Sequence, residues 1–417
     1  MDKNRNILKL SIYMAFMSAS IAVPGSLLLI DMLLLRMHFD IKLFGMIKSS
    51  IFLMPAIAYW LLANTLRNLK IGAAVCRWAY LTRITVPLLL PLTALYVQSA
   101  ALRMTICVAV FSISFSAAMI ANNTLLTLCK AAVPDNAFNR YAAFFTILQS
   151  VPASALGYPL AKLLGKPGLD DTQFLHLFLI VEIVVCIFYI PAFVCLRNLE
   201  LKNMQPPPKV SFSEYLMPFK DASCRPLFAL TFIRTFWMGM LTSYWTVYIL
   251  KVRGWHPDTI VIFEMAMMFA LIFIAPMFGR FADEKGFRIC FLSLFLMAFS
   301  AACLHVVFWT STAFLVLAII VNHHGNVAIV SSSSLTLLST AVVVCAPKGH
   351  SERYIAAASF FNSIGAFAGC CVASHLFTWL SHGNEADSAV FRNYFALITL
   401  LILPQIACTL MLKERCH

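Results

Sequence analysis

Long apolar runs alternate with short polar segments along the whole chain, and this pattern predicts its secondary structure. A helix needs about 20 consecutive apolar residues to cross the hydrocarbon core of a bilayer. The chain contains twelve such runs, at residues 8–37, 43–63, 73–97, 104–128, 138–164, 174–196, 227–250, 260–278, 287–309, 313–344, 354–380 and 391–412. We therefore expect an all-α membrane protein with twelve transmembrane helices.

Composition and charge agree with a membrane location. The sequence is 61% hydrophobic and 12% charged, whereas soluble domains carry about 25% charged residues. The basic start MDKNRNILK precedes an apolar run that is longer than a secretory signal, so we expect it to be retained as the first span. Most Lys and Arg residues lie near the termini and in the even-numbered connections. The net charge of +13 therefore indicates cytoplasmic termini in the cytoplasmic (inner) membrane, not a nucleic-acid partner.

Metal and enzyme chemistry find little support in the sequence. The 13 cysteines form no C-x-x-C pair, which favours a packing role. The adjacent His323 and His324 diverge on a regular helix, and no third ligand is suggested. No nucleotide-binding loop, His-Glu-x-x-His or Gly-x-Ser-x-Gly motif is present. We therefore expect no metal, no cofactor and no enzymatic activity.

One long polar segment divides the chain into two halves. We expect an N-terminal six-helix bundle over 1–196, a cytoplasmic linker with a triple proline over 197–225, and a C-terminal six-helix bundle over 226–417. PDNAFNRYAA follows the fourth span and PKGHSERYIAA follows the tenth, and both contain Arg-Tyr six residues after Pro. Gln149 and Asn362 occupy equivalent positions in the two halves, so the halves are expected to be related by pseudo-symmetry.

The connection after the eighth span carries the most specific motif, GRFADEKGFR at 279–288. It resembles the G-x-x-x-D-x-x-G-x-R loop of the major facilitator superfamily. In this resemblance Gly279 and Gly286 allow close backbone approach, while Asp283, Arg288 and Arg353 form a gating charge network. The acidic Glu284 and the first-half counterpart Leu69 depart from the family pattern, which puts a symmetrical latch in doubt.

The resemblance implies two six-helix bundles around a central cavity that opens alternately to each side of the membrane. It also implies that spans 1, 4, 7 and 10 line this cavity. The implied partners are a small-molecule solute, protons and the lipid bilayer, and the implied state is a monomer.

The seventh span presents a polar and aromatic face. Arg234, Trp237, Tyr244 and Tyr248 fall within about 100° of arc at the helical period. A guanidinium near the middle of the bilayer can bind a carboxylate or phosphate, and aromatic rings offer stacking surfaces. We expect these residues to contact the solute; the alternative is that they neutralise a protein charge and pack between helices.

Amide side chains mark further candidate contacts within the spans. Asn322 and Asn326 share one stripe of the tenth span, and His323 flanks it as a titratable group. Asn122, Gln149 and Asn362 complete the set of predicted solute-binding residues. For each amide, hydrogen bonding between helices is an equally good interpretation.

Carboxylates are rare within the spans. Asp31 and Glu264 lie on cavity-associated spans, where a buried carboxylate can exchange a proton as its exposure alternates. Structural pairing of such an acid, including with Arg234 or Arg36, fits equally well. On the supporting spans, we expect Glu182 and Arg83 to form an ion pair.

Two transport hypotheses follow from these residues. The first is a secondary transporter for a small polar organic solute, anionic or hydroxylated, that is coupled to protons. The second is a proton-coupled exporter of amphipathic compounds or lipids, which fits the aromatic face of the seventh span. A membrane sensor without transport and an intramembrane enzyme are the remaining alternatives.

Overall fold

Helices make up the regular structure of the protein. The computed structural model describes residues 3–22, 27–41, 43–62, 69–132, 138–166, 168–199, 217–330, 338, 341–342, 345–346, 351–381 and 387–412, and within this part no strand is present. By length and composition, six of the described helical segments can cross a membrane: Lys70–Tyr96, Ala100–Asn122, Asp171–Arg197, Glu284–Val307, Arg353–Ser381 and Ser388–Leu410. The predicted all-α membrane fold is confirmed.

The chain divides into two compact units, described in turn below. Unit 1 comprises Met1–Lys209 and Arg253–Phe269, and unit 2 comprises Val210–Val252 and Ala270–His417. The first change of unit falls inside the segment that the sequence predicts as a linker. The beginning of the eighth predicted span groups with unit 1.

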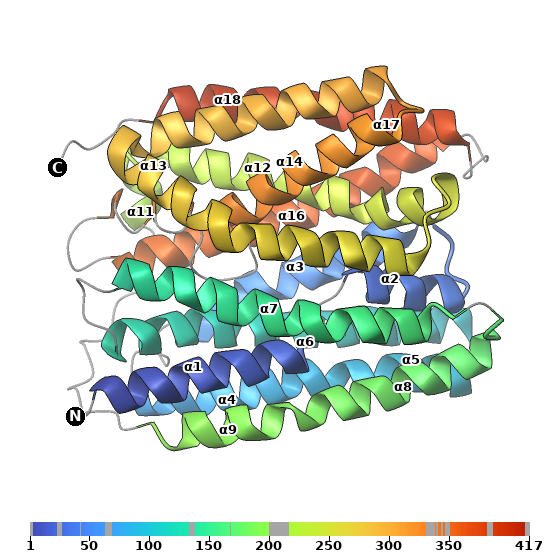
Figure 1. Cartoon of the computed structure of the whole chain (residues 1–417), viewed down its shortest axis with the longest axis horizontal. Helices are drawn as coiled ribbons and strands as arrows, with labels where there is room; N and C mark the ends of the chain where they lie inside the picture. Colours follow the sequence, from blue (N-terminus) through green and yellow to red (C-terminus); the bar gives the residue numbers. More distant parts are fainter. Residues whose placement is uncertain are drawn as a thin grey trace. The chain divides into compact units, whose positions relative to one another are not determined.

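Unit 1 contains the first six predicted spans (Figure 1). Its helices are α1 (Lys3–Ser20), α2 (Leu27–Arg36), α3 (Leu43–Leu62), α4 (Leu69–Thr85), the 3-10 helix η2 (Val86–Leu88), α5 (Leu89–Tyr96), α6 (Ala100–Ala132), α7 (Phe138–Leu164), α8 (Asp171–Ile187) and α9 (Tyr189–Arg197). Helix α7 has the predicted bounds of the fifth span. The first, third and sixth predicted spans are each built from successive shorter helices.

The core of unit 1 forms where these helices meet. Helix α6 packs along α3 and α4, and α1 packs against α7 and α9. Tyr13 of α1, Tyr80 of α4 and Tyr189 of α9 are fully buried. The ring centroids of Tyr13 and Tyr80 lie 5.9 Å apart, and those of Tyr80 and Tyr189 lie 6.4 Å apart. Aromatic packing therefore ties three helices together at this point.

The third predicted span is interrupted by η2. Pro87 has no backbone N–H, so the carbonyl oxygen of Arg83 loses the donor that a regular helix would supply. The hydroxyl of Ser114 on α6 donates to this carbonyl at 2.8 Å. The thiol of Cys186 on α8 donates to the carbonyl of Ile84 at 3.4 Å. Side chains from neighbouring helices thus satisfy backbone acceptors at the break, as an apolar interior requires.

Unit 2 contains the second group of helices. They are α11 (Met217–Lys220), α12 (Arg225–Val247), the π-helical turn η4 (Tyr248–Val252), α14 (Thr312–Val330), α16 (Ser351–Ser381), α17 (Ser388–Leu400) and α18 (Ile402–Leu410). Helix α13 (Pro257–Val307) begins in unit 1 and continues in unit 2. Gly286 interrupts it with φ 83° and ψ 159°. A residue without Cβ adopts this conformation at low cost, so Gly286 separates the eighth predicted span from the ninth.

The closest packing in unit 2 joins α12 and α16. A Cβ atom added at Gly239 would collide with the carbonyl of Ala366. A Cβ added at Gly365 or Gly369 would collide with the carbonyls of Phe232 and Phe236 respectively. Small residues let the two backbones approach closely, which is a common way of associating helices in membranes. Helix α18 also packs on α12.

Candidate functional site

Asp31 of α2 and Lys48 of α3 form an ion pair inside unit 1. Lys48 Nζ lies 2.7 Å from Asp31 Oδ1 and 2.9 Å from Oδ2. The exposed fraction of the side chain is 0% for Asp31 and 2% for Lys48. An isolated buried charge is very costly, so the two groups compensate each other's charge within the helix packing.

The pairing of Asp31 differs from the partners considered in the sequence. Arg36 does not hold Asp31, because its guanidinium bonds to Asp171 at the start of α8. The sequence does not indicate Lys48 as the partner of Asp31. Lys48 lies near the beginning of the second predicted span, where a lysine usually extends to the membrane surface. Its spacing from Asp31 along the sequence gives no pairing signal, because the two residues lie on different helices.

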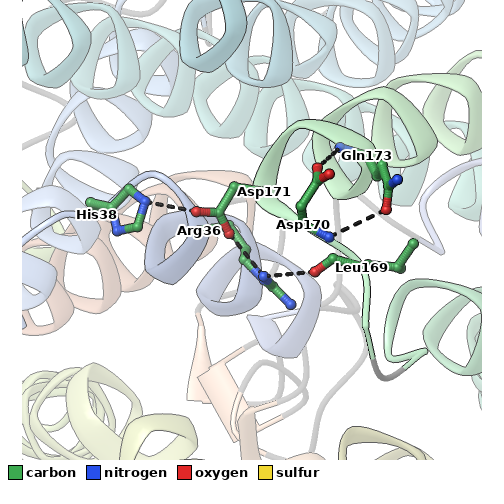
Figure 2. A network of polar contacts seen from close by, with 6 residues as sticks. All are labelled: Arg36, His38, Leu169, Asp170, Asp171 and Gln173. Carbon is green, nitrogen blue, oxygen red and sulfur yellow. Dashed lines mark hydrogen bonds and ion pairs between the residues drawn. The ribbon is translucent and has the colours of Figure 1, made fainter.

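The end of α2 and the beginning of α8 are joined by a second polar network (Figure 2). Arg36 Nη1 lies 2.8 Å from Asp171 Oδ1 and donates to the carbonyl of Leu169 at 3.2 Å. His38 Nε2 lies 2.8 Å from Asp171 Oδ2. Asp170 and Gln173 form a capping box at the N-terminus of α8. This network is partly exposed, in contrast to the Asp31–Lys48 pair.

Asn122 of α6 points into the core of unit 1. It is buried, and its Oδ1 accepts a hydrogen bond from the hydroxyl of Tyr80 on α4. The guanidinium carbon of Arg83 lies 5.9 Å from the centroid of the Tyr80 ring. Asn122 thus makes the interhelical hydrogen bond that was the alternative to solute contact, and solute contact itself stays a prediction.

The predicted ion pair between Glu182 and Arg83 is wrong. Both residues are buried, yet the ion pairs formed by the described residues do not include them. Glu182 Oε2 has no hydrogen-bond partner among the described residues. Arg83 instead directs its guanidinium to the Tyr80 ring. The similar depth of the two residues in their spans was a poor guide, because it does not fix the directions of the side chains.

Arg234 lies in the interior of unit 2 on α12. Its exposed fraction is 1%, and its Nη1 donates to Oε1 of Gln405 on α18 at 3.2 Å. The guanidinium carbon lies 4.6 Å from the Trp237 ring and 5.4 Å from the Phe295 ring. Protein groups therefore engage the guanidinium on several sides, and contact with a solute stays a prediction.

The aromatic residues that follow Arg234 pack between helices of unit 2. Tyr244 stacks on Phe377 of α16 with ring centroids 4.1 Å apart. Tyr248 lies 4.9 Å from Trp309 and 5.1 Å from Phe395. Tyr244 and Tyr248 are fully buried. The packing alternative thus describes these rings, and their contact with a solute stays a prediction.

The remaining predicted amides and acids are only partly described. Asn322 Nδ2 donates to the carbonyl of Ala318 at 2.9 Å, one turn earlier in α14. Asn362 is half-buried on α16. The side chains of Gln149, Glu264, His323 and Asn326 lie outside the described residues. The proposed roles of these residues stay predictions.

The predicted gating loop is resolved in part. Gly286 has the backbone conformation reported above, Arg288 is exposed and Arg353 is half-buried. Gly279 and Asp283 belong to α13, but their surroundings lie outside the described part of the chain. The charge network between Asp283, Arg288 and Arg353 therefore stays a prediction.

Tyr354, which follows Arg353, makes a contact that the sequence did not indicate. Its hydroxyl donates to Asp221 Oδ2 at 2.8 Å. Asp221 Oδ1 accepts from the backbone N–H and hydroxyl of Ser223 at 2.9 and 2.6 Å. The segment before α12 is thereby tied to the beginning of α16. The Asp-x-Ser pattern predicts a local turn, but its distant partner Tyr354 could not be found from spacing.

The fold agrees with sequence and structure comparisons. The family model described as Major Facilitator Superfamily matches residues 153–370. No curated protein sequence matches the chain. Three solved structures illustrate the likeness in fold over nearly the whole chain.

The first is the human organic anion transporter MFSD10 (TETRAN), which is 13% identical, with 97% of this chain and 100% of that chain covered and a TM-score of 0.63. A D-xylose-proton symporter is 12% identical, with 96% of each chain covered and a TM-score of 0.70. The Escherichia coli fucose:proton symporter is 12% identical, with 97% of this chain and 98% of that chain covered and a TM-score of 0.63. The TM-scores and coverages establish a common fold, and the low identities leave the solute open.

Proposed function

This chain belongs to the Major Facilitator Superfamily, and from that membership we propose that it moves a small polar organic solute, anionic or hydroxylated, by alternating access coupled to protons. It is a membrane transporter and not an enzyme. The observation that carries the proton coupling is the buried ion pair of Asp31 and Lys48. The proposal includes a monomer in the inner membrane with both termini in the cytoplasm.

The ion pair supplies a physical link between a proton and helix packing. When a proton binds Asp31, the carboxyl becomes neutral and the buried Lys48 ammonium loses the compensating charge of this carboxylate. Such a charge destabilises the packed arrangement by several kcal/mol. Protonation would therefore favour a conformation in which α2 and α3 let water reach Lys48, which is what coupling requires.

The chemistry of the solute is proposed from the polar groups within the spans and from the structural neighbours. A guanidinium and several amides suit carboxylates and hydroxyls. Arg234, Trp237, Asn122 and Asn322 are the described residues that we propose as solute contacts in at least one state of the cycle. The neighbours named as symporters take D-xylose and fucose, and a third is named an organic anion transporter.

The alternative, an exporter of amphipathic compounds, has less support. It was suggested by the aromatic residues of the seventh span, and in the structure Tyr244 and Tyr248 are buried against rings of α16 and α17. Rings that already pack against protein offer little surface to an apolar compound. We therefore favour the polar solute.

Uptake into proteoliposomes tests this proposal. The probes are D-xylose, L-fucose and lactate as polar solutes, and tetraphenylphosphonium as a lipophilic cation, each with and without an imposed pH gradient. We expect uptake of a polar solute that rises with an inward proton gradient. Uptake that is indifferent to the gradient would reject proton coupling, and transport of the lipophilic cation alone would favour the exporter.

Two variants connect the result to Asp31. Asp31→Asn combined with Lys48→Met removes both charges together, so it avoids an unpaired ammonium, and it should abolish the response to the gradient. Asp171→Asn removes a partly exposed carboxylate of the same unit and serves as the matched control. Equal gradient dependence in both variants and the unmodified protein would show that Asp31 is not the coupling group.

A further inference from the structure

Glu182 is a buried carboxyl that the mechanism proposed above does not use. It lies on α8 with an exposed fraction of 3%, on the same face as Phe178, Val181 and Val185, which are also buried. On the other side of the helix, Ile180 and Ile183 are 57% and 48% exposed. The carboxyl therefore points into unit 1 and not towards lipid.

No ion pair holds this carboxyl within the described part of unit 1. Oε2 of Glu182 has no hydrogen-bond partner among the described residues, and the ion pairs there involve other carboxylates. Asp31, in contrast, is held by Lys48 at 2.7 Å. An ionised carboxylate without a partner is far more costly in an apolar interior than a protonated one.

The ionisable groups on the helices around α8 have other roles. The elements that pack against α8 are α1, α2, α5, α7, α9 and η2. Several ionisable groups on these elements form an ion pair or a hydrogen bond: Asp31 with Lys48, Arg36 with Asp171, Tyr13 with Cys76, Lys9 with the carbonyl of Asn198, and Tyr189 with the carbonyl of Arg77. Their exposed groups are Arg5, Tyr96, Lys162 and Arg197; Tyr158 and Cys195 are half-buried, and the side chains of Lys3, Arg140 and Tyr141 lie outside the described residues. Cys186, one turn after Glu182, donates to the carbonyl of Ile84.

A break in the helix that faces α8 lies at Cys186, one turn after Glu182. The Cys186 thiol bonds to the backbone at Ile84, immediately before η2, and η2 itself packs against α8. A helix that changes to 3-10 geometry at a proline is a natural place for bending. Movement at this break would change the access of water to the interior face of α8.

We propose that Glu182 is a second proton-binding site of unit 1, whose carboxyl holds a proton in the packed state and releases it when the contact between α8 and η2 opens. The ligand is a proton, since Glu182 forms no ion pair among the described residues and the guanidinium of Arg83, next to Ile84, lies over the Tyr80 ring. The inference deepens the proposed proton coupling, and it is tested without a transported solute.

Infrared spectroscopy of the full chain in lipid gives a direct test, because a protonated carboxyl has a C=O stretching band that an ionised carboxylate lacks. We expect such a band at neutral pH, its reversible loss on alkaline titration, and its absence in Glu182→Gln. The control that lacks Asp31 and Lys48 (Asp31→Asn with Lys48→Met) should keep the band. Glu182→Asp should keep an acid band at a shifted frequency, and it carries the test if the Gln variant does not fold.

Two results would overturn the inference. The first is a spectrum in which neither Glu182→Gln nor Glu182→Asp changes the acid band, which would mean that Glu182 holds no proton. The second is a Glu182 band that persists throughout the alkaline titration, which would mean a permanently protonated structural group. Uptake by the unmodified protein that is indifferent to the proton gradient, together with a titrating Glu182 band, would reject the proposed coupling through Asp31 and leave this site standing.

Discussion

Lys48 of unit 1 and Arg234 of unit 2 are buried basic side chains that are accommodated by different means. In unit 1 the Lys48 ammonium meets the Asp31 carboxylate at 2.7 Å. In unit 2 the Arg234 guanidinium bonds to the Gln405 amide and lies over the rings of Trp237 and Phe295. A carboxylate can be neutralised by one proton, whereas a guanidinium gives up its proton far less readily. We therefore propose that protonation changes the charge of the Asp31–Lys48 pair in unit 1, whereas the charge of Arg234 in unit 2 does not take part.

The backbones of the two units also differ in how readily they can bend. Unit 1 interrupts its third span at η2 and satisfies the freed carbonyls with Ser114 and Cys186. Unit 2 joins α12 to α16 through glycines that leave no room for a Cβ. A proline break tolerates bending more readily than a close backbone contact does. We therefore expect unit 1 to bend at this break while α12 and α16 move together.

The largest effect is expected from breaking the ion pair of unit 1 on one side. Asp31→Asn leaves the Lys48 ammonium buried without its carboxylate, which should lower stability by about 3–5 kcal/mol. The measurement is the apparent melting temperature of the purified protein in detergent. Adding Lys48→Met should recover most of the loss. If Asp31→Asn melts like the unmodified protein, the Lys48 ammonium reaches water easily. Unit 1 would then not depend on the ion pair to accommodate this buried charge.

The glycine contact of unit 2 provides the next test, because a matched glycine exists in unit 1. Gly369→Ala places a methyl group against the carbonyl of Phe236, and such overpacking costs about 1–3 kcal/mol. Gly157→Ala on α7 meets no atom within 4 Å and should stabilise by up to about 1 kcal/mol through helix propensity. The melting temperatures should therefore shift in opposite directions. A similar shift in both variants would mean that the approach of α12 and α16 does not limit stability.

The architecture could be predicted from the sequence because apolar length is a local property. The bounds of α7 and the positions of α3, α6, α12 and α16 follow directly from runs that can cross a bilayer. The breaks inside spans were harder to predict. Pro87 indicates a disturbance, but whether it bends, ends or tightens a helix depends on donors such as Ser114 that lie elsewhere in the sequence.

Residues of the candidate site were easier to find than their partners. Asp31, Arg234 and Asn122 are visible as polar side chains in apolar runs, since such residues are rare there. Their partners Lys48, Gln405 and Tyr80 lie on other helices, and the directions of those side chains depend on packing. The failed pairing of Glu182 with Arg83 has the same cause. Depth in the membrane can be read from a single sequence, but the rotation of one helix against another cannot.

Variants of Arg234 separate the effect of the guanidinium charge from the effect of its planar shape. Arg234→Gln removes the guanidinium from the Trp237 and Phe295 rings, and we expect a loss of about 1–2 kcal/mol because relief of a buried charge offsets part of the lost contacts. Arg234→Lys keeps the charge without the planar stacking surface. If the guanidinium also meets an anionic solute, Arg234→Gln should abolish lactate uptake and spare D-xylose uptake. An equal change for both solutes would limit Arg234 to a structural role.

The smallest effect is expected at the exposed network between α2 and α8. The Arg36 and Asp171 side chains are 38% and 37% exposed, and water screens an ion pair of this kind, so Asp171→Asn should cost at most about 1 kcal/mol. Added salt should shrink the difference between the variant and the unmodified protein, whereas the loss in Asp31→Asn should respond little to salt. Melting temperatures of both variants at low and high salt provide the measurement. Equal salt dependence of the two variants would show that the Asp31–Lys48 pair is accessible to water. The buried ion pair and the exposed Arg36–Asp171 pair of unit 1 would then not differ in their exposure to solvent.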